Sequence, residues 1–366
     1  MQKDLFYLLA LQKVKGVGDI NAKKLLKYFG SAEEVFKNLS QEKTEPPGIG
    51  SFIAGQIKNF NDFDRVEKEL KFIEQNRITP VSIFDAGYPH HLFHAPDAPI
   101  LFFKKGNFNL KNRKIISIVG TRNITPYGKR TVEEIIEGLK EYNPVIVSGL
   151  AYGVDINAHI TALKHGLDTI GVLGHGFQRI YPAIHQKIAS DMLQQGGLIT
   201  EFWHTDTIDR NNFLKRNRII AGISEATLII ESGEKGGSLV TANIANSYNR
   251  DVFAVPGRAS DIYSAGCNNL IKNNQAQLVT NARDIIRFLR WEDNNKKREN
   301  PQLNLFVDLT PEEQQIFDFL RENGKTGLDE IAISTGFPVS KTAQLLLQME
   351  LNNVVTGLAG KQFEII

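Results

Sequence analysis

The chain has 366 residues, of which 42% are apolar and 23% charged, a balance that excludes a disordered or collagen-like protein. Its single cysteine excludes an internal disulfide, and no apolar stretch reaches the roughly 18 residues that a membrane span requires. The formal net charge of +2 is too small to attract polyanions through overall charge, so only local basic patches could do this. The single cysteine fits a reducing compartment, so we expect a cytoplasmic protein, and the length predicts two or three domains.

Residues 1–80 are expected to form a helical domain of the helix-hairpin-helix or SAM-like type. Two glycine turns, at 16–18 and 46–50, each precede a segment with apolar residues at helical spacing. Residues 1–30 carry six Lys and two Asp, which suits an anionic partner. The turns either contact phosphate or only join packed helices, and both interpretations stay open.

Residues 81–290 alternate short apolar runs with helical stretches. This alternation predicts an α/β domain with a Rossmann-like, doubly wound, mostly parallel sheet covered by helices on both faces. The expected strands are 115–119, 145–147, 170–173, 198–200, 228–230, 252–255 and 278–279.

Residues 291–305 are polar and rich in Asn and Lys, as in a linker. Residues 306–366 are expected to form a winged-helix domain. Thr310 and Glu313 form a capping box before a first helix, two further helices are expected near 328–335 and 340–352, and a hairpin follows. From 310 on there are four basic and eight acidic residues, so we expect this domain to contact protein or its neighbour rather than DNA.

Glycine and small hydroxyl residues follow several predicted strands, including Gly120-Thr121, Ser148-Gly149 and Gly237-Ser238. The carboxyl ends of parallel strands meet at one edge of a sheet, where backbone N–H groups can bind an anion. Any one of these loops alone is explained by a tight turn. Together they predict a phosphate-binding edge.

The segment 210–218 contains four basic residues, no acidic residue and one aromatic residue, Phe213. Cations at the start of a helix are disfavoured by its dipole unless an anion is nearby, and Phe213 can stack on a base. The alternative is a solvated basic face.

Enzymatic motifs are incomplete, and we expect no catalytic residue, cofactor or metal. The first Rossmann-like strand lacks a G-x-G-x-x-G loop, and Gly324-Lys325-Thr326 lacks the first glycine of a P-loop. Asp155 and His159 have no third metal ligand, so we expect hydrogen bonding within their loop. Cys267 has no evident base and is expected to be structural.

A series of motifs in order along 88–280 resembles the DNA-processing protein family DprA (Smf). The motifs include Val119-Gly-Thr-Arg122, Ser148-Gly-Leu-Ala-Tyr-Gly-Val-Asp155, Phe213-x-x-Arg-Asn-Arg218, Gly237-Ser-Leu-x-Thr241 and Gly266-Cys-Asn268. The helical start and the winged-helix end also fit, so the resemblance covers nearly the whole chain.

The resemblance implies a non-enzymatic protein that binds and protects incoming single-stranded DNA and loads the RecA recombinase during natural transformation and homologous recombination. It also implies a homodimer through the Rossmann-like domain. The site residues it implies, together with those singled out above, are Gly120, Thr121, Arg122, Ser148, Gly149, Phe213, Lys215, Arg216, Asn217, Arg218, Ser238 and Thr241. Lys215 replaces the proline that is usual in the family, a change expected to alter a loop.

Two other functions remain open. A nucleotide-hydrolysing Rossmann-like enzyme would need a carboxylate soon after Gly236-Gly237, but Ala242 and Asn243 stand there. A scaffold whose winged helix is the active part is the third possibility.

Overall fold

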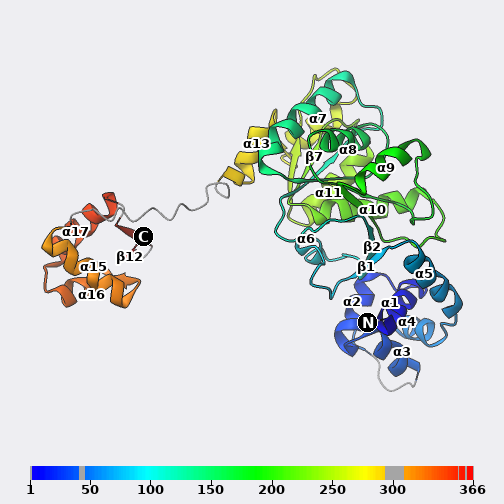
Figure 1. The fold of residues 1–366 in the computed structure, drawn as a ribbon, viewed down its shortest axis with the longest axis horizontal. Coiled ribbons are helices and arrows are strands. Elements are labelled where there is room, and N and C mark those ends of the chain that lie inside the picture. The colour runs from blue at the N-terminus through cyan, green and yellow to red at the C-terminus, as the bar shows by residue number, and fades with distance from the viewer. Residues whose placement is uncertain (1, 41–45, 293–308, 353, 359–360, 366) are drawn as a thin grey trace. The chain divides into compact units, whose positions relative to one another are not determined.

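The computed structural model describes residues 2–40, 46–292, 309–352, 354–358 and 361–365, which belong to two compact units, Met1–Trp291 and Glu292–Ile366 (Figure 1). The expected linker 291–305 lies outside the described residues from 293 on.

The first unit begins with five helices, drawn in blue in Figure 1: α1 (Gln2–Lys13), α2 (Asp19–Phe29), α3 (Ala32–Ser40), α4 (Ser51–Lys58) and α5 (Phe63–Gln75). In the first glycine turn Gly16 has φ +83°, a conformation that favours glycine. The helices bury an apolar cluster that also takes in Phe103 and Trp203 from the sheet domain. The helices and the sheet therefore share a core.

The sheet of this unit has nine strands in the order β1-β2-β6-β5-β4-β3-β7-β8-β9. The strands from β6 to β9 in this order run parallel, and β1 and β2 pair antiparallel at one edge, which confirms the predicted mostly parallel sheet. Their bounds are β1 (Thr79–Ser82), β2 (Leu101–Lys105), β3 (Ile115–Val119), β4 (Val145–Ser148), β5 (Thr169–Val172), β6 (Gly196–Thr200), β7 (Ala226–Ile229), β8 (Asp251–Ala254) and β9 (Gln277–Leu278).

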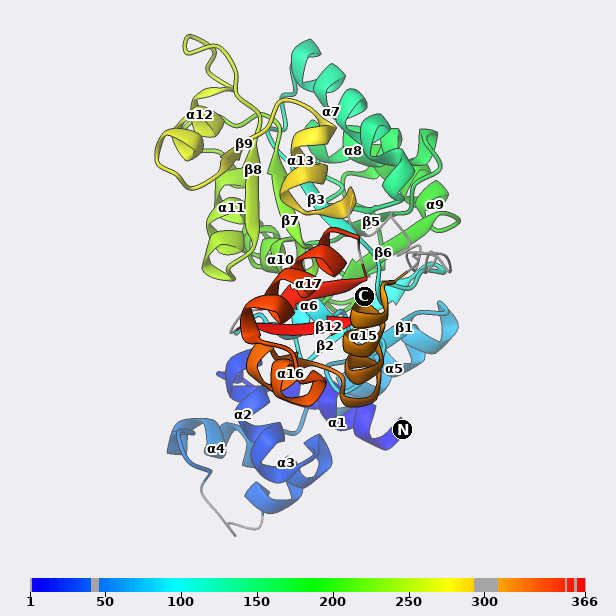
Figure 2. The ribbon, with the colours of Figure 1, turned by 90° about the vertical axis from the view of Figure 1, so that its left-hand side faces the viewer.

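Alternating side chains of the buried strands face two helical layers. In β3, Ile115 and Val119 join the apolar cluster of one face, and Ile116 and Ile118 join that of the other. The first face carries α6 (His90–Phe93), α10 (Arg210–Ile223), α11 (Gly237–Ser247) and α12 (Ala265–Lys272). The second carries α7 (Pro126–Leu139), α8 (Val154–Lys164) and α13 (Ala282–Phe288), which lie side by side in Figure 2. Helix α9 (Gln186–Met192) and two short 3-10 turns, η1 (Lys140–Tyr142) and η2 (Ala183–His185), complete the unit.

The order of the strands reverses at β3. From β3 the chain builds β4, β5 and β6 outward in one direction, and α10 then returns it to β7, on the other side of β3. The chain leaves β3 toward α7 on one face of the sheet and leaves β7 toward α11 on the other, which opens a crevice between the carboxyl ends of these two strands. Open α/β sheets bind ligands at this kind of switch point.

The second unit has the helices and hairpin of a winged helix. Its elements are α15 (Pro311–Asn323), β10 (Thr326–Gly327), α16 (Leu328–Thr335), α17 (Val339–Leu351), β11 (Val355–Leu358) and β12 (Gln362–Ile365). The predicted capping box of Thr310 and Glu313 is present at the start of α15. Lys341, the one basic residue of α17, pairs with Glu312.

Within the described part of the chain, no helix combines the length and the hydropathy needed to cross a bilayer.

Candidate nucleic-acid interface

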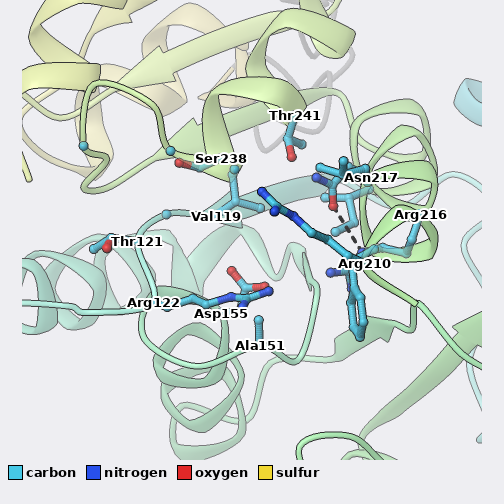
Figure 3. Close-up of a pocket in the computed structure, with 17 residues that line it drawn as sticks. Val119, Thr121, Arg122, Ala151, Asp155, Arg210, Arg216, Asn217, Ser238 and Thr241 are labelled. Atoms are coloured by element: carbon cyan, nitrogen blue, oxygen red, sulfur yellow. Dashed lines mark hydrogen bonds between the residues drawn. The ribbon is translucent and has the colours of Figure 1, made fainter. Parts of the chain in front are cut away.

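A cavity of about 370 Å³ opens at the switch point, and we call it the switch-point slot (Figure 3). It lies between the loop after β3, the loop after β7, and helices α10 and α11. Its lining residues are Val119, Gly120, Thr121, Arg122, Ala151, Asp155, Arg210, Phe213, Leu214, Arg216, Asn217, Ile220, Gly233, Gly236, Gly237, Ser238 and Thr241.

Helix α10 supplies six of the residues that line the slot, more than any other element. Arg210, Phe213 and Asn217 recur at the spacing of helical turns, and Figure 3 shows Arg210 and Asn217 at the same wall. The helix begins after Asp209, whose carboxylate accepts the N–H of Asn211 at 2.7 Å. This acidic cap offsets the cost of placing basic residues at the positive end of a helix.

Two residues of the expected site, Lys215 and Arg218, lie on another face of α10 and do not line the slot. Arg218 is 6% exposed and donates to Glu201 Oε2 at 2.5 Å and to Asp19 Oδ2 at 3.0 Å. Lys215 Nζ lies 3.1 Å from the same Glu201 oxygen, and the residue sits inside the helix rather than in a loop. Helical periodicity therefore divides the basic segment into a slot-facing set and an internally paired set.

Arg216 forms the buried wall of the slot. It is 4% exposed, and its guanidinium donates to the carbonyl oxygens of Gly149, at 2.7 Å, and of Val172. Burial lowers the pKa of Arg216 to about 10, so it stays protonated at neutral pH, and the positive charge of Arg122 acts in the same direction. Arg122 and Arg216 are therefore close enough within the slot for their charges to interact.

Asp155 is the acidic residue of the slot, and it is held by its surroundings. Burial raises the pKa of its carboxyl group, and Arg216 opposes this rise. The carboxylate accepts the N–H of Gly149 at 3.1 Å, which confirms the expected hydrogen bond within the loop. His159 instead bonds Thr169 through Nδ1 at 2.7 Å.

Ser148 and Gly149 support the slot rather than line it. The Ser148 hydroxyl is buried and donates to the carbonyl oxygen of Ile118 at 2.6 Å. A Cβ at Gly149 would lie 2.5 Å from the guanidinium nitrogens of Arg216. This glycine therefore lets Arg216 approach the backbone.

The loop after β3 is fixed by its backbone, while the side chain of Arg122 stays exposed. Thr121 donates its N–H to the carbonyl oxygen of Glu231 at 2.7 Å and accepts from Val154 N at 3.1 Å. Gly153, with φ +77°, passes so close that a Cβ would lie 2.1 Å from the Thr121 carbonyl oxygen. Arg122 makes no ion pair or hydrogen bond through its side chain with any residue that the structure describes, so it can contact a ligand.

Helix α11 directs its amino end into the slot. Its N-cap is Gly236, which has no side chain to cap the first N–H groups. Ser238 donates to Ser232 Oγ at 2.9 Å, and Thr241, one turn further along the helix, also lines the cavity. An uncapped helix start combined with three guanidinium groups is suited to a phosphate.

The structure brings Gly120, Thr121, Arg122, Phe213, Arg216, Asn217, Ser238 and Thr241 together around the slot. Sequence reasoning left Arg210 and Asp155 out of the expected site. Arg210 belongs to the basic segment already noticed, one helical turn before Phe213, so periodicity signals it. Among the described residues no group of three His, Cys, Asp or Glu side chains is arranged to hold a metal ion.

Two family models match the chain: DNA recombination-mediator protein A over residues 79–290, and the DprA winged helix domain over residues 305–361. A protein Smf from Synechocystis is 30% identical over 98% of both chains. The DNA processing protein DprA of Streptococcus pneumoniae is 38% identical over 58% of this chain and 75% of its own.

Solved structures agree with these matches. An X-ray structure of DprA from Streptococcus pneumoniae has a TM-score of 0.66, with 31% identity over 77% of this chain and 97% of that chain. A structure of DNA processing protein A from Helicobacter pylori, described for its single-stranded DNA binding mode, has a TM-score of 0.53. It shares 28% identity over 59% of this chain and 97% of its own.

Proposed function

Since the chain belongs to the DprA/Smf family of DNA recombination-mediator proteins, we propose that it binds single-stranded DNA through the switch-point slot, without catalysing a reaction. The observation that carries this proposal is the convergence of Arg122, Arg210 and Arg216 with the uncapped start of α11. Guanidinium groups and backbone N–H groups bind phosphate, and contacts with phosphate do not depend on the base. Binding is therefore expected to tolerate any sequence.

The near-neutral net charge supports a preference for unpaired strands. With a formal charge of +2, the protein has no large positive field to hold a rigid duplex. A cavity of about 370 Å³ beside the ring of Phe213 can accept a flexible strand whose base stacks on an aromatic face. Phe213 also lies 5.8 Å from Tyr181, ring centre to ring centre, which fixes its position.

Titration of fluorescently labelled single- and double-stranded oligonucleotides at several salt concentrations tests the proposal. Two phosphate contacts on a single strand, at Arg122 and Arg210, predict a slope of log K against log salt of about −1.4. Arg122→Ala and Arg210→Ala should each weaken binding about tenfold, the usual effect of losing a charged hydrogen bond. Unchanged affinity in both variants would refute the slot as the binding site.

For the alternative enzymatic function, the residues that line the slot include one carboxylate, that of Asp155. This carboxylate accepts the N–H of Gly149 and interacts with the charge of Arg216. It therefore supports the wall rather than acting as a free base. Incubation with nucleoside monophosphates tests this point, because release of free base would favour the nucleotide-hydrolysing alternative.

Membership of the family supports a more specific biological role. We infer that the protein protects incoming DNA, loads RecA, acts in the cytoplasm and forms a homodimer through residues 81–290. Sedimentation of the full chain tests the dimer. RecA-dependent strand exchange, with and without this protein, tests the loading role.

A further inference from the structure

A second hollow of about 710 Å³ opens beside the switch-point slot, and we call it the side groove. Its walls are the start of α7, the end of β7 and the loop 256–264. The residues used in the argument below are Tyr127, Arg130, Glu231, Arg258, Asp261, Ile262 and Tyr263.

The side groove adjoins the slot, because residues that line the two hollows pack against one another. Gly233 lines the slot, and a Cβ at this position would lie 3.8 Å from the carbonyl oxygen of Ile262, which lines the groove. Ser232, next to Gly233, donates its N–H to the Tyr263 carbonyl oxygen at 2.6 Å. Asn123, which follows the slot residue Arg122, donates to the Tyr263 hydroxyl at 3.3 Å. The two hollows are therefore neighbours on the side of Arg122 and Gly233.

The groove presents ring and alkyl surfaces that the core does not cover. Ile262 is 78% exposed and Tyr127 is 44% exposed. The Tyr127 hydroxyl donates to the Pro256 carbonyl oxygen at 3.0 Å, which holds the ring in place. The loop that carries Ile262 is anchored as well, because the side chain of Asn268 bonds both the N–H and the carbonyl of Gly257. The Tyr127 ring and the loop that carries Ile262 are therefore held by hydrogen bonds within the protein.

The charges in the groove favour contact with phosphate at one wall. Arg130 and Arg258 are exposed, and neither forms an ion pair with another described residue. Of the two acids, Glu231 is 2% exposed and its carboxylate accepts the N–H of Thr125 at 2.9 Å and the hydroxyl of the same residue. Asp261 is exposed on the loop, so the groove as a whole is close to neutral. Binding here must come from contact with rings and individual arginines rather than from a strong field.

We propose that the side groove holds the nucleotides adjacent to those in the slot, with a base against Tyr127 and Ile262 and a backbone phosphate at Arg258. This inference rests on the proposed function. Its support is the adjacency of the two hollows, the pairing of aromatic surface with unpaired arginines in both, and a groove volume nearly twice that of the slot. Base stacking and single arginine contacts are how proteins hold unpaired strands without reading sequence.

The test is a length series of labelled oligothymidylates, from a length that fills only the slot to lengths that also reach the groove. Arg258→Ala should reduce the salt slope by about 0.7 for the long oligonucleotides and leave it unchanged for the short ones. Ile262→Ser should weaken binding of the long oligonucleotides about fivefold, because it removes apolar surface that a base would cover. Both side chains are exposed, so both variants should keep the melting temperature of the wild type.

Arg283→Ala is the matched control, because it removes the same charge from another surface. Arg283 is exposed on α13, which packs at Gly138 near the carboxyl end of α7. The groove is at the amino end of α7, and Tyr127 lies 11 residues before Gly138 on this helix, so the two sites are about 16 Å apart. An oligonucleotide with 5-iodouracil at successive positions adds a direct readout, since photocrosslinking to Tyr127 or Tyr263 should occur only at positions beyond those that fill the slot.

The outcomes separate the two proposals. If Arg122→Ala weakens binding at every length but Arg258→Ala and Ile262→Ser match the wild type at every length, the slot stands and the groove proposal is wrong. An equal loss of affinity in Arg258→Ala and Arg283→Ala would also overturn it, because the effect would then come from the overall charge of the protein rather than from a contact in the groove. A wild-type protein that binds no oligonucleotide of any length would refute both proposals.

Discussion

Replacement of Arg218 by methionine should destabilise the protein strongly and leave its affinity for DNA intact. Arg218 joins three parts of the first unit, because it donates to Asp19 in α2, to Glu201 after β6 and to the carbonyl oxygen of Asp97. The second carboxylate oxygen of Glu201 is buried and has no hydrogen-bond partner among the described residues. Arg218→Met therefore leaves a buried carboxylate without its main compensating charge.

Removing one partner of a buried ion pair costs about 3–5 kcal/mol. The unit Met1–Trp291 has an unfolding entropy of about 0.6 kcal/mol/K by the usual per-residue scaling. The melting temperature of Arg218→Met should accordingly fall by about 5–8 °C. Lys215→Met is the matched control, since Lys215 contacts the same Glu201 oxygen but its side chain is 53% exposed. An exposed pair contributes at most about 1 kcal/mol, so this variant should lose less than about 2 °C.

The pH dependence gives a second readout of the same contact. Burial raises the pKa of Glu201, and the charge of Arg218 opposes this rise, so the pKa should rise further in Arg218→Met. An acid whose folded-state pKa is raised binds its proton more tightly in the folded state. The loss of stability that Arg218→Met causes relative to the wild type should therefore become smaller as the pH is lowered from 7 toward the ordinary carboxyl pKa of 4.5. It should become larger again as the pH rises.

Differential scanning calorimetry gives the melting temperatures, and oligonucleotide titration at a temperature where both proteins are folded gives the affinities. The affinity of Arg218→Met should stay within about twofold of the wild type, because Arg218 lies outside the slot. A tenfold loss of affinity without loss of stability would show that Arg218 contacts DNA. Equal melting temperatures for Arg218→Met and Lys215→Met would refute the reasoning from burial.

Three further predictions concern other parts of the chain. Burial lowers the pKa of His159 to about 3, so between pH 6.5 and 4 stability should fall by about 3 kcal/mol, and urea unfolding of His159→Asn should show a flatter pH dependence. Gly149→Ala should displace Arg216 and lower both stability and affinity, whereas Gly237→Ala, whose Cβ meets no atom within 4 Å, should narrow the slot and change affinity alone. Deleting residues 306–366 should leave oligonucleotide affinity nearly unchanged, whereas a large loss would show that the winged helix binds DNA.

The parallel strands of the sheet were predictable because burial on both faces leaves an uninterrupted apolar run. Ile115–Val119 is such a run, and β3 occupies it. The two antiparallel edge strands gave weaker signals. β1 has four residues and contains Pro80, and β2 ends in Lys104 and Lys105, so neither has the pattern of a strand buried throughout.

The site was predictable as a set of loops but not as a set of side chains. The glycine motifs placed Gly120, Gly149 and Gly237 at one edge, yet the sequence does not show that the hydroxyl of Ser148 bonds the β3 backbone. The basic segment was taken as one patch, although a period of 3.6 residues already places Lys215 and Arg218 on another face from Phe213. Their acidic partners, Asp19 and Glu201, are remote in sequence, and only the tertiary structure identifies them.

The arrangement also accounts for how the proposed binding of a polyanion is compatible with almost no net charge. Arg218 and Lys215 are neutralised by internal carboxylates, and Arg216 is held among backbone carbonyls. Only a few guanidinium groups, such as those of Arg122 and Arg210, remain to meet phosphates, and they lie inside a narrow crevice. A duplex is too stiff and too wide to enter a cavity of this size, whereas a single strand can bend its backbone into it. If the proposed binding selects by shape with few charges, salt should weaken the complex only moderately.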